Sequence, residues 1–199
     1  MPTRTQLRSM VHTYMEVTPF ILLTTLAEIA AGAFLLDIRG FFELLPGLLF
    51  LLPGLMELRG NVATSLAQRL GSAIHIGLVS WDKGYNNILR SNVESSIALS
   101  LVVSGVLSVG VYLWSLVVGV LVVNLLTLIL LAFLTAALSA VTQAFLAAFV
   151  AVYAAYRGLD PDNVTAPVLS VIGDILTIVF LILAVKLVLY LSPIIQLVG

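Results

Sequence analysis

Long apolar runs alternate with short polar segments along the whole chain. The first run covers 17–36 and follows a polar segment, 1–16, while the last run covers 167–191. Between them lie the runs 41–77 and 97–156, the second of which is essentially uncharged. A helix needs about 20 mostly apolar residues to cross the hydrocarbon core of a bilayer. The pattern therefore predicts an all-α integral membrane protein.

Two of these runs are too long to form one spanning helix each. The run 41–77 contains several Pro and Gly residues, and breaks at membrane depth are tolerated where the freed backbone groups face protein or water. We expect a second helix broken near Pro53. The run 97–156 would extend roughly 90 Å as one helix, so it must fold back, and an interfacial Trp favours a turn at 112–115. The expected total is five spanning helices, although three shorter spans within 97–156 remain possible.

Basic residues are distributed unevenly between the predicted loops. Short cytoplasmic loops are enriched in Lys and Arg, and this bias predicts a cytoplasmic N-terminus. We therefore expect a cytoplasmic segment, 1–16, followed by a single membrane domain, 17–199. The inner segments then hold Arg4, Arg8, Lys83, Arg90 and Arg157, and the outer segments hold Arg39 alone.

Composition excludes several other classes of protein. The chain is 61% hydrophobic and only 10% charged, whereas soluble domains are about 25% charged. A formal net charge of −1 provides no basic surface for nucleic acid. No Cys is present, which excludes disulfides and thiolate metal sites. A single short chain of this kind, surrounded by membrane lipid, fits a prokaryotic plasma membrane.

Polar residues recur on one face of the second predicted helix. Glu57, Asn61, Thr64 and Gln68 follow one another at steps of three or four, which aligns them along a helix. Interhelical hydrogen bonding uses the same residue types, and for any one of these residues that alternative stays open. For the whole stripe we expect a hydrated pathway.

Asp174 lies deep in the last predicted helix, and Ser170 and Thr177 share its face. Lys186, the nearest basic residue in that helix, is about three turns away. A charged side chain inside a span costs about 2.5–3.5 kcal/mol on insertion scales. We therefore expect Asp174 to bind a cation; the alternative is a protonated, hydrogen-bonded carboxyl group.

Arg59 and Glu28 are the other charged residues that the site must accommodate. A cation pathway repels a free guanidinium, so Arg59 is expected to form a structural ion pair with Glu28 or Glu57. Glu28 could instead line the pathway, since ionisable residues inside a membrane mark ion routes by default. The residues leave both roles open for Glu28.

The available ligands are carboxylates, amides and hydroxyls, which are hard oxygen donors. Soft metals are therefore disfavoured. Mg²⁺ keeps several of its waters and uses one or two carboxylates. One Asp174 per chain, doubled in a homodimer, would hold a hydrated divalent cation weakly enough for it to leave again.

Two segments resemble the signatures of the MgtE-type divalent-cation transporters, and most closely those of their eukaryotic solute-carrier relatives. Residues 53–61 read PGLMELRGN, and 64–70 read TSLAQRL. About a hundred residues later, 158–164 reads GLDPDNV, followed by Pro167 and then by the pair Gly173-Asp174. The two motifs occur in the order that the family uses.

The resemblance implies a five-helix membrane domain that works as a homodimer and transports Mg²⁺, with other divalent cations sometimes passing. It corresponds only to the membrane part of bacterial members. The resemblance further implies a pathway lined by the second and fifth helices, with the ion bound by Asp174. Arg59 and Gly173 belong to the same motifs and are expected to be structural. The pathway wall would include Pro53, Gly54, Glu57, Gly60 and Asn61.

A simple Mg²⁺ pathway has three alternatives as the function of this chain. A Na⁺- or H⁺-coupled divalent cation exchanger would use Asp174 or Glu28 as a coupling site. A structural membrane subunit would leave Asp174 without a role. An enzyme is not expected, because no nucleophile-elbow motif and no His-Glu-x-x-His metal motif is present.

Overall fold

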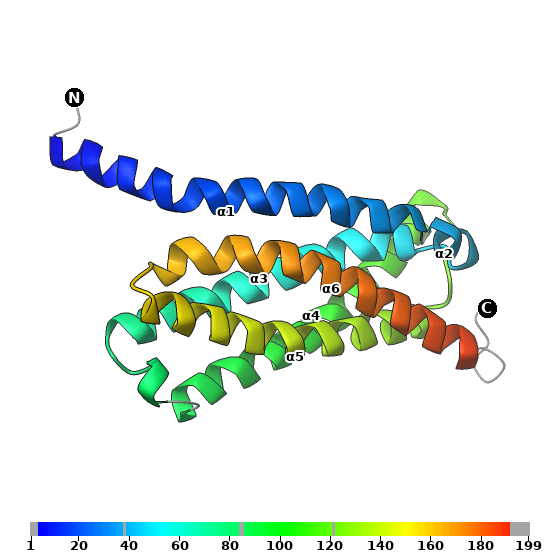
Figure 1. Ribbon diagram of the computed structural model, residues 1–199. Helices are drawn as coiled ribbons and strands as arrows, with labels where there is room; N and C mark the ends of the chain where they lie inside the picture. The colour runs from blue at the N-terminus through cyan, green and yellow to red at the C-terminus, as the bar shows by residue number, and fades with distance from the viewer. Residues whose placement is uncertain (1–3, 38, 84–85, 121, 192–199) are drawn as a thin grey trace.

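The computed structural model describes residues 4–37, 39–83, 86–120 and 122–191. These residues form helices and short connections, with no strand among them (Figure 1), which confirms the all-α prediction. Five of the helices are long, while α2 and the 3₁₀ helix η1 are short. The elements are α1 (Arg4–Asp37), α2 (Arg39–Leu44), α3 (Leu48–His75), η1 (Trp81–Lys83), α4 (Asn87–Val118), α5 (Leu125–Tyr156) and α6 (Pro161–Leu191).

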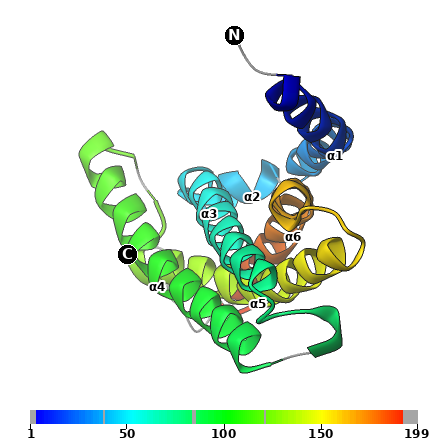
Figure 2. The same cartoon turned by 90° about the vertical axis from the view of Figure 1, so that its left-hand side faces the viewer.

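The five long helices run in alternating directions along a common axis. In Figure 1, α1 begins at the left end of the molecule and α6 ends at the right end. Seen end-on in Figure 2, α3 occupies the middle of the arrangement, where it packs against α4, α5 and α6. The outermost helix, α1, packs mainly on α6. Helix α6 therefore contacts both α1 and α3.

Small side chains let α4 and α5 approach each other closely. Serines on one face of α4 are buried, and α5 meets them with buried Ala, Ser and Thr residues. Ser108 donates its hydroxyl to the Ser104 carbonyl at 2.8 Å and lies 3.3 Å from the Leu128 carbonyl of α5. Hydroxyls that bond backbone carbonyls can be buried between helices, so this serine face serves packing.

The turn between α4 and α5 was predicted at 112–115, and that prediction is wrong. Helix α4 continues to Val118 and ends at Gly119, which adopts a left-handed conformation (φ 72°) that glycine tolerates. Helix α5 starts after Asn124, whose side chain accepts a hydrogen bond from the Thr127 amide at 2.8 Å. The caps, rather than the position of Trp114, fix the turn.

The break in the second predicted helix also lies elsewhere. Helix α3 continues through Pro53, and the chain instead leaves the helical path between Leu44 and Leu48. Gly47 there has φ 108°, and a Cβ on it would lie 3.1 Å from Val122. Only glycine fits this left-handed, crowded position easily. The break thus belongs to the Pro46-Gly47 pair at the end of the bundle.

Three helices in the described part of the chain are long and apolar enough to cross a membrane: α4, α5 and the segment Asn163–Leu191 of α6. A shorter apolar stretch, Val17–Leu26, lies in α1. Helix α3 has 28 residues, but its polar residues keep it out of that group. The integral membrane character is therefore carried by at least these three helices.

Candidate cation site

Arg59 of α3 and Asp174 of α6 form a buried ion pair. The Nη2 of Arg59 donates to Asp174 Oδ1, and Nη1 donates to the Leu169 carbonyl at 3.1 Å. The side chain of Arg59 is 7% exposed and that of Asp174 is 18% exposed. Arg59 was expected to pair with Glu28 or Glu57, and that prediction is wrong. Its partner is Asp174, which has no basic residue nearby in its own helix but receives one from a position 115 residues earlier.

Gly173 makes room for this ion pair. A Cβ on Gly173 would overlap the Nη1 atom and crowd the guanidinium carbon of Arg59. The guanidinium therefore lies close to the backbone of α6, where it donates to both Leu169 and Asp174. The Gly-Asp pair of the second motif thus combines a space for the cationic group with the carboxylate that holds it.

Glu28 of α1 completes a cluster of two carboxylates and one guanidinium. Its Oε1 accepts a hydrogen bond from the Ser170 hydroxyl at 3.3 Å. Glu28 also interacts electrostatically with both Arg59 and Asp174. Helices α1, α3 and α6 therefore bring two acidic side chains and one basic side chain together.

Thr177 was predicted to share the face of Asp174 in the pathway. The structure buries its side chain, and its hydroxyl donates to the Gly173 carbonyl at 2.9 Å. That bond runs within α6 from one turn to the next. Thr177 therefore bonds only the backbone of its own helix, next to Asp174, whereas Ser170 contacts Glu28 in the cluster.

The polar stripe of α3 faces away from this cluster. Glu57, Asn61 and Gln68 are exposed, and Thr64 is partly exposed. Asn61 donates to Glu57 at 2.9 Å. Arg59 projects from the opposite side of the helix into the bundle, as a spacing of two residues requires. Within one chain, the predicted stripe and Asp174 therefore lie on opposite sides of α3.

The motif residues Gly54 and Gly60 have different surroundings. A Cβ on Gly54 would lie 2.5 Å from the Leu107 side chain, so this glycine lets α3 and α4 approach. A Cβ on Gly60 would meet nothing within 4 Å. Beside Gly54, a groove of about 430 Å³ between α3 and α4 contains Glu57 and Asn61 at its polar edge.

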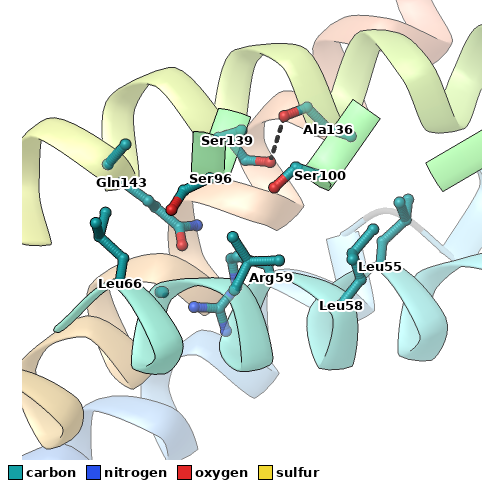
Figure 3. Close-up of a pocket in the computed structure, with 13 residues that line it drawn as sticks. Leu55, Leu58, Arg59, Leu66, Ser96, Ser100, Ala136, Ser139 and Gln143 are labelled. Carbon is teal, nitrogen blue, oxygen red and sulfur yellow. Dashed lines mark hydrogen bonds between the residues drawn. The ribbon is translucent and has the colours of Figure 1, made fainter. Parts of the chain in front are cut away.

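A small, partly open pocket adjoins Arg59 on the side of α4 and α5 (Figure 3). Its volume of about 20 Å³ leaves room for roughly one water molecule. Gln143 of α5 points its amide toward α3, and neither amide atom has a hydrogen-bond partner. The Nε of Arg59 is also without one. Only the fold brings Gln143 to Arg59, since the two residues lie on different helices.

No group of three or more His, Asp or Glu residues that could hold a metal gathers in the described part of the chain. A cation at the cluster would therefore meet the Glu28 and Asp174 carboxylates and complete its shell with hydroxyls, carbonyls or water.

Comparison with known proteins agrees with these chemical features. The family model for MgtE, a divalent cation transporter, matches residues 52–184, which include most of α3, all of α4 and α5, most of α6 and both motifs. No curated protein and no solved structure matches the chain. MgtE is a family of transporters and not of enzymes. Because the match covers more than half of the chain, this protein belongs to the MgtE family of divalent cation transporters.

Proposed function

We propose that the chain carries Mg²⁺ across the membrane as a homodimer, through a pathway lined by α3 and α6. One observation carries this proposal: the exposed face of α3 is hydrophilic. Lipid cannot satisfy the polar groups of Glu57, Asn61 and Gln68. A second copy of the chain facing this stripe across a file of water would satisfy them.

Five spanning helices and a cytoplasmic N-terminus are part of the proposal. The alternating directions of α1, α3, α4, α5 and α6 support this count (Figure 1). The loops before α4 and α6 lie at the same end of the bundle as the start of α1. Lys83, Arg90 and Arg157 belong to that end, whereas Arg39 belongs to the other. Because short cytoplasmic loops are enriched in Lys and Arg, this distribution supports a cytoplasmic location for the first end.

The ion-binding element of the proposal is Asp174, with Glu28 and Ser170 beside it. A charge of −2 from the two carboxylates matches a divalent cation, and oxygen ligands suit Mg²⁺. Glu57, Asn61, Thr64 and Gln68 form the hydrated wall along which the ion approaches or leaves. In a dimer each of these groups occurs twice, so the ion can move between weak sites.

Mg²⁺ flux into liposomes that hold the purified chain tests the proposal. We expect flux in protein-containing liposomes and none in empty ones, together with a dimer on chemical cross-linking. Flux that ignores Na⁺ and H⁺ gradients indicates a passive pathway, whereas flux that follows one gradient indicates a coupled exchanger. A folded protein that moves no divalent cation would overturn the proposal, as would a monomer with full flux.

A further inference from the structure

The guanidinium of Arg59 lies where a transported cation would be bound. It contacts Asp174 directly and interacts with Glu28 through space. With Arg59 in place the cluster has one negative charge in excess. A divalent cation added to this arrangement would leave an excess positive charge in a low-dielectric site, whereas a divalent cation without Arg59 would be neutralised by the two carboxylates. The ion and the guanidinium therefore compete for the same acids.

We propose that Arg59 is a tethered counter-ion, which neutralises Asp174 when no ion is bound and is displaced by the transported divalent cation. This inference rests on the proposed function and adds its regulation. Between transport events, Arg59 therefore keeps the Asp174 carboxylate from being left without a partner inside the helix bundle. It also weakens cation binding, because only the fraction of molecules with Arg59 displaced is competent to bind. Weak binding allows the ion to leave.

The pocket beside Arg59 offers polar partners for the displaced guanidinium. Gln143 is 3% exposed, and both of its amide atoms lack partners, which is rare for a buried polar group. The Ser100 and Ser139 side chains line the same pocket, and Ser139 already donates to the Thr135 carbonyl at 2.7 Å, so its lone pairs remain available. A rotation of Arg59 away from Asp174 would direct its donors to the Gln143 carbonyl oxygen, and the neighbouring side chains must move to admit it, because the free space there equals about one water molecule.

Gly173 offers a way to displace Arg59 without removing it. The atom that a Cβ on Gly173 would overlap is the far end of the flexible Arg59 side chain, and the same Cβ would lie 3.1 Å from Gln143 Nε2. A Gly173→Ala change therefore moves the guanidinium off Asp174 while its charge stays in the protein. Gly105 in α4 serves as a matched control, because a Cβ there would meet nothing within 4 Å.

The test compares wild type, Arg59→Gln, Gly173→Ala and Gly105→Ala in Mg²⁺ flux and in Mg²⁺-dependent thermal stabilisation. We expect the Mg²⁺ concentration at half effect to fall about tenfold in the first two variants, since the competing charge is removed or displaced. Gly105→Ala should match wild type. Unchanged concentration dependence in both variants, beside an active wild type, overturns the counter-ion role alone. A wild type that neither transports nor responds to Mg²⁺ overturns the proposed function instead.

A Gln143→Leu variant separates displacement from packing. Leucine fills the same space but offers no acceptor to the displaced guanidinium, so the half-effect Mg²⁺ concentration should rise several-fold while thermal stability without Mg²⁺ does not fall. A purely structural Gln143 would give the reverse result, a loss of stability with an unchanged response to Mg²⁺, and that result would contradict the second position of Arg59.

Discussion

Helices α3 and α5 expose opposite kinds of surface. The exposed positions of α5 include Phe133, Phe145 and Phe149, which suit contact with lipid chains. The exposed positions of α3 include Glu57, Asn61 and Gln68, which lipid cannot satisfy. The exposed surface of α5 is therefore suited to contact with lipid. The exposed surface of α3 instead requires contact with water or with a second copy of the chain.

Acidic substitutions on the two faces should give the largest difference. Phe133→Asp places a charge against lipid and should destabilise the protein by about 2.5–3.5 kcal/mol. Ser65→Asp extends the polar surface of α3, where Ser65 is exposed, and should change stability by less than about 0.5 kcal/mol. Thermal unfolding in lipid nanodiscs measures both. Equal losses in the two variants would contradict the assignment of the faces.

Thiol accessibility sharpens the same comparison. A Cys at Gln68 or Thr64 should react with an aqueous thiol reagent at least about tenfold faster than a Cys at Phe133, because the reactive thiolate forms in water. The reaction is followed in intact liposomes by mass shift. A Cys at Lys83, in the polar connection before α4, serves as the positive control. If it reacts while neither α3 position does, the α3 stripe is packed between chains without water, which would contradict a hydrated pathway.

Removing polarity from α3 should affect transport more than folding. Asn61→Leu eliminates the hydrogen bond to Glu57 and makes one turn of the proposed wall apolar. We expect flux to fall several-fold, with dimer assembly and unfolding temperature close to wild type. A matched Leu138→Asn change on the exposed surface of α5 should instead reduce stability and leave the flux per folded protein unchanged.

The serine face of α4 should show the smallest effect. Ser104→Ala removes a hydroxyl that donates to the Leu101 carbonyl of its own helix at 2.8 Å. The small side chain remains, so packing against α5 is preserved and stability should change by less than about 0.5 kcal/mol. A loss of Mg²⁺ flux in this variant would show that the serine face contributes chemistry as well as packing.

The helices could be predicted because long apolar runs have few alternatives in a membrane protein. Their ends were harder to predict. An interfacial Trp was a poorer guide to the α4–α5 turn than the glycine and asparagine caps at Gly119 and Asn124. Similarly, Pro53 lies near the start of α3 within a continuous helix, whereas Pro46 and Gly47 together end the helical path.

The candidate site could be predicted only in part, since its contacts join distant segments. Periodicity was sufficient to identify the α3 stripe, and isolation within an apolar helix was sufficient to select Asp174. The pairing of Asp174 with Arg59 spans 115 positions and follows from the packing of α3 on α6. The approach of Gln143 to the same guanidinium likewise requires the fold, because nothing near Gln143 in the sequence marks it.

Mg²⁺ flux in liposomes with Asp174→Asn beside Glu94→Gln is the most direct test of the account. Asparagine keeps an oxygen for Arg59 while it removes the negative charge, and Glu94 is an exposed acid paired with Arg90 at 2.7 Å, outside the proposed pathway. We predict that Asp174→Asn abolishes flux in a folded protein and that Glu94→Gln retains it. Normal flux in Asp174→Asn would contradict the assignment of the cation site.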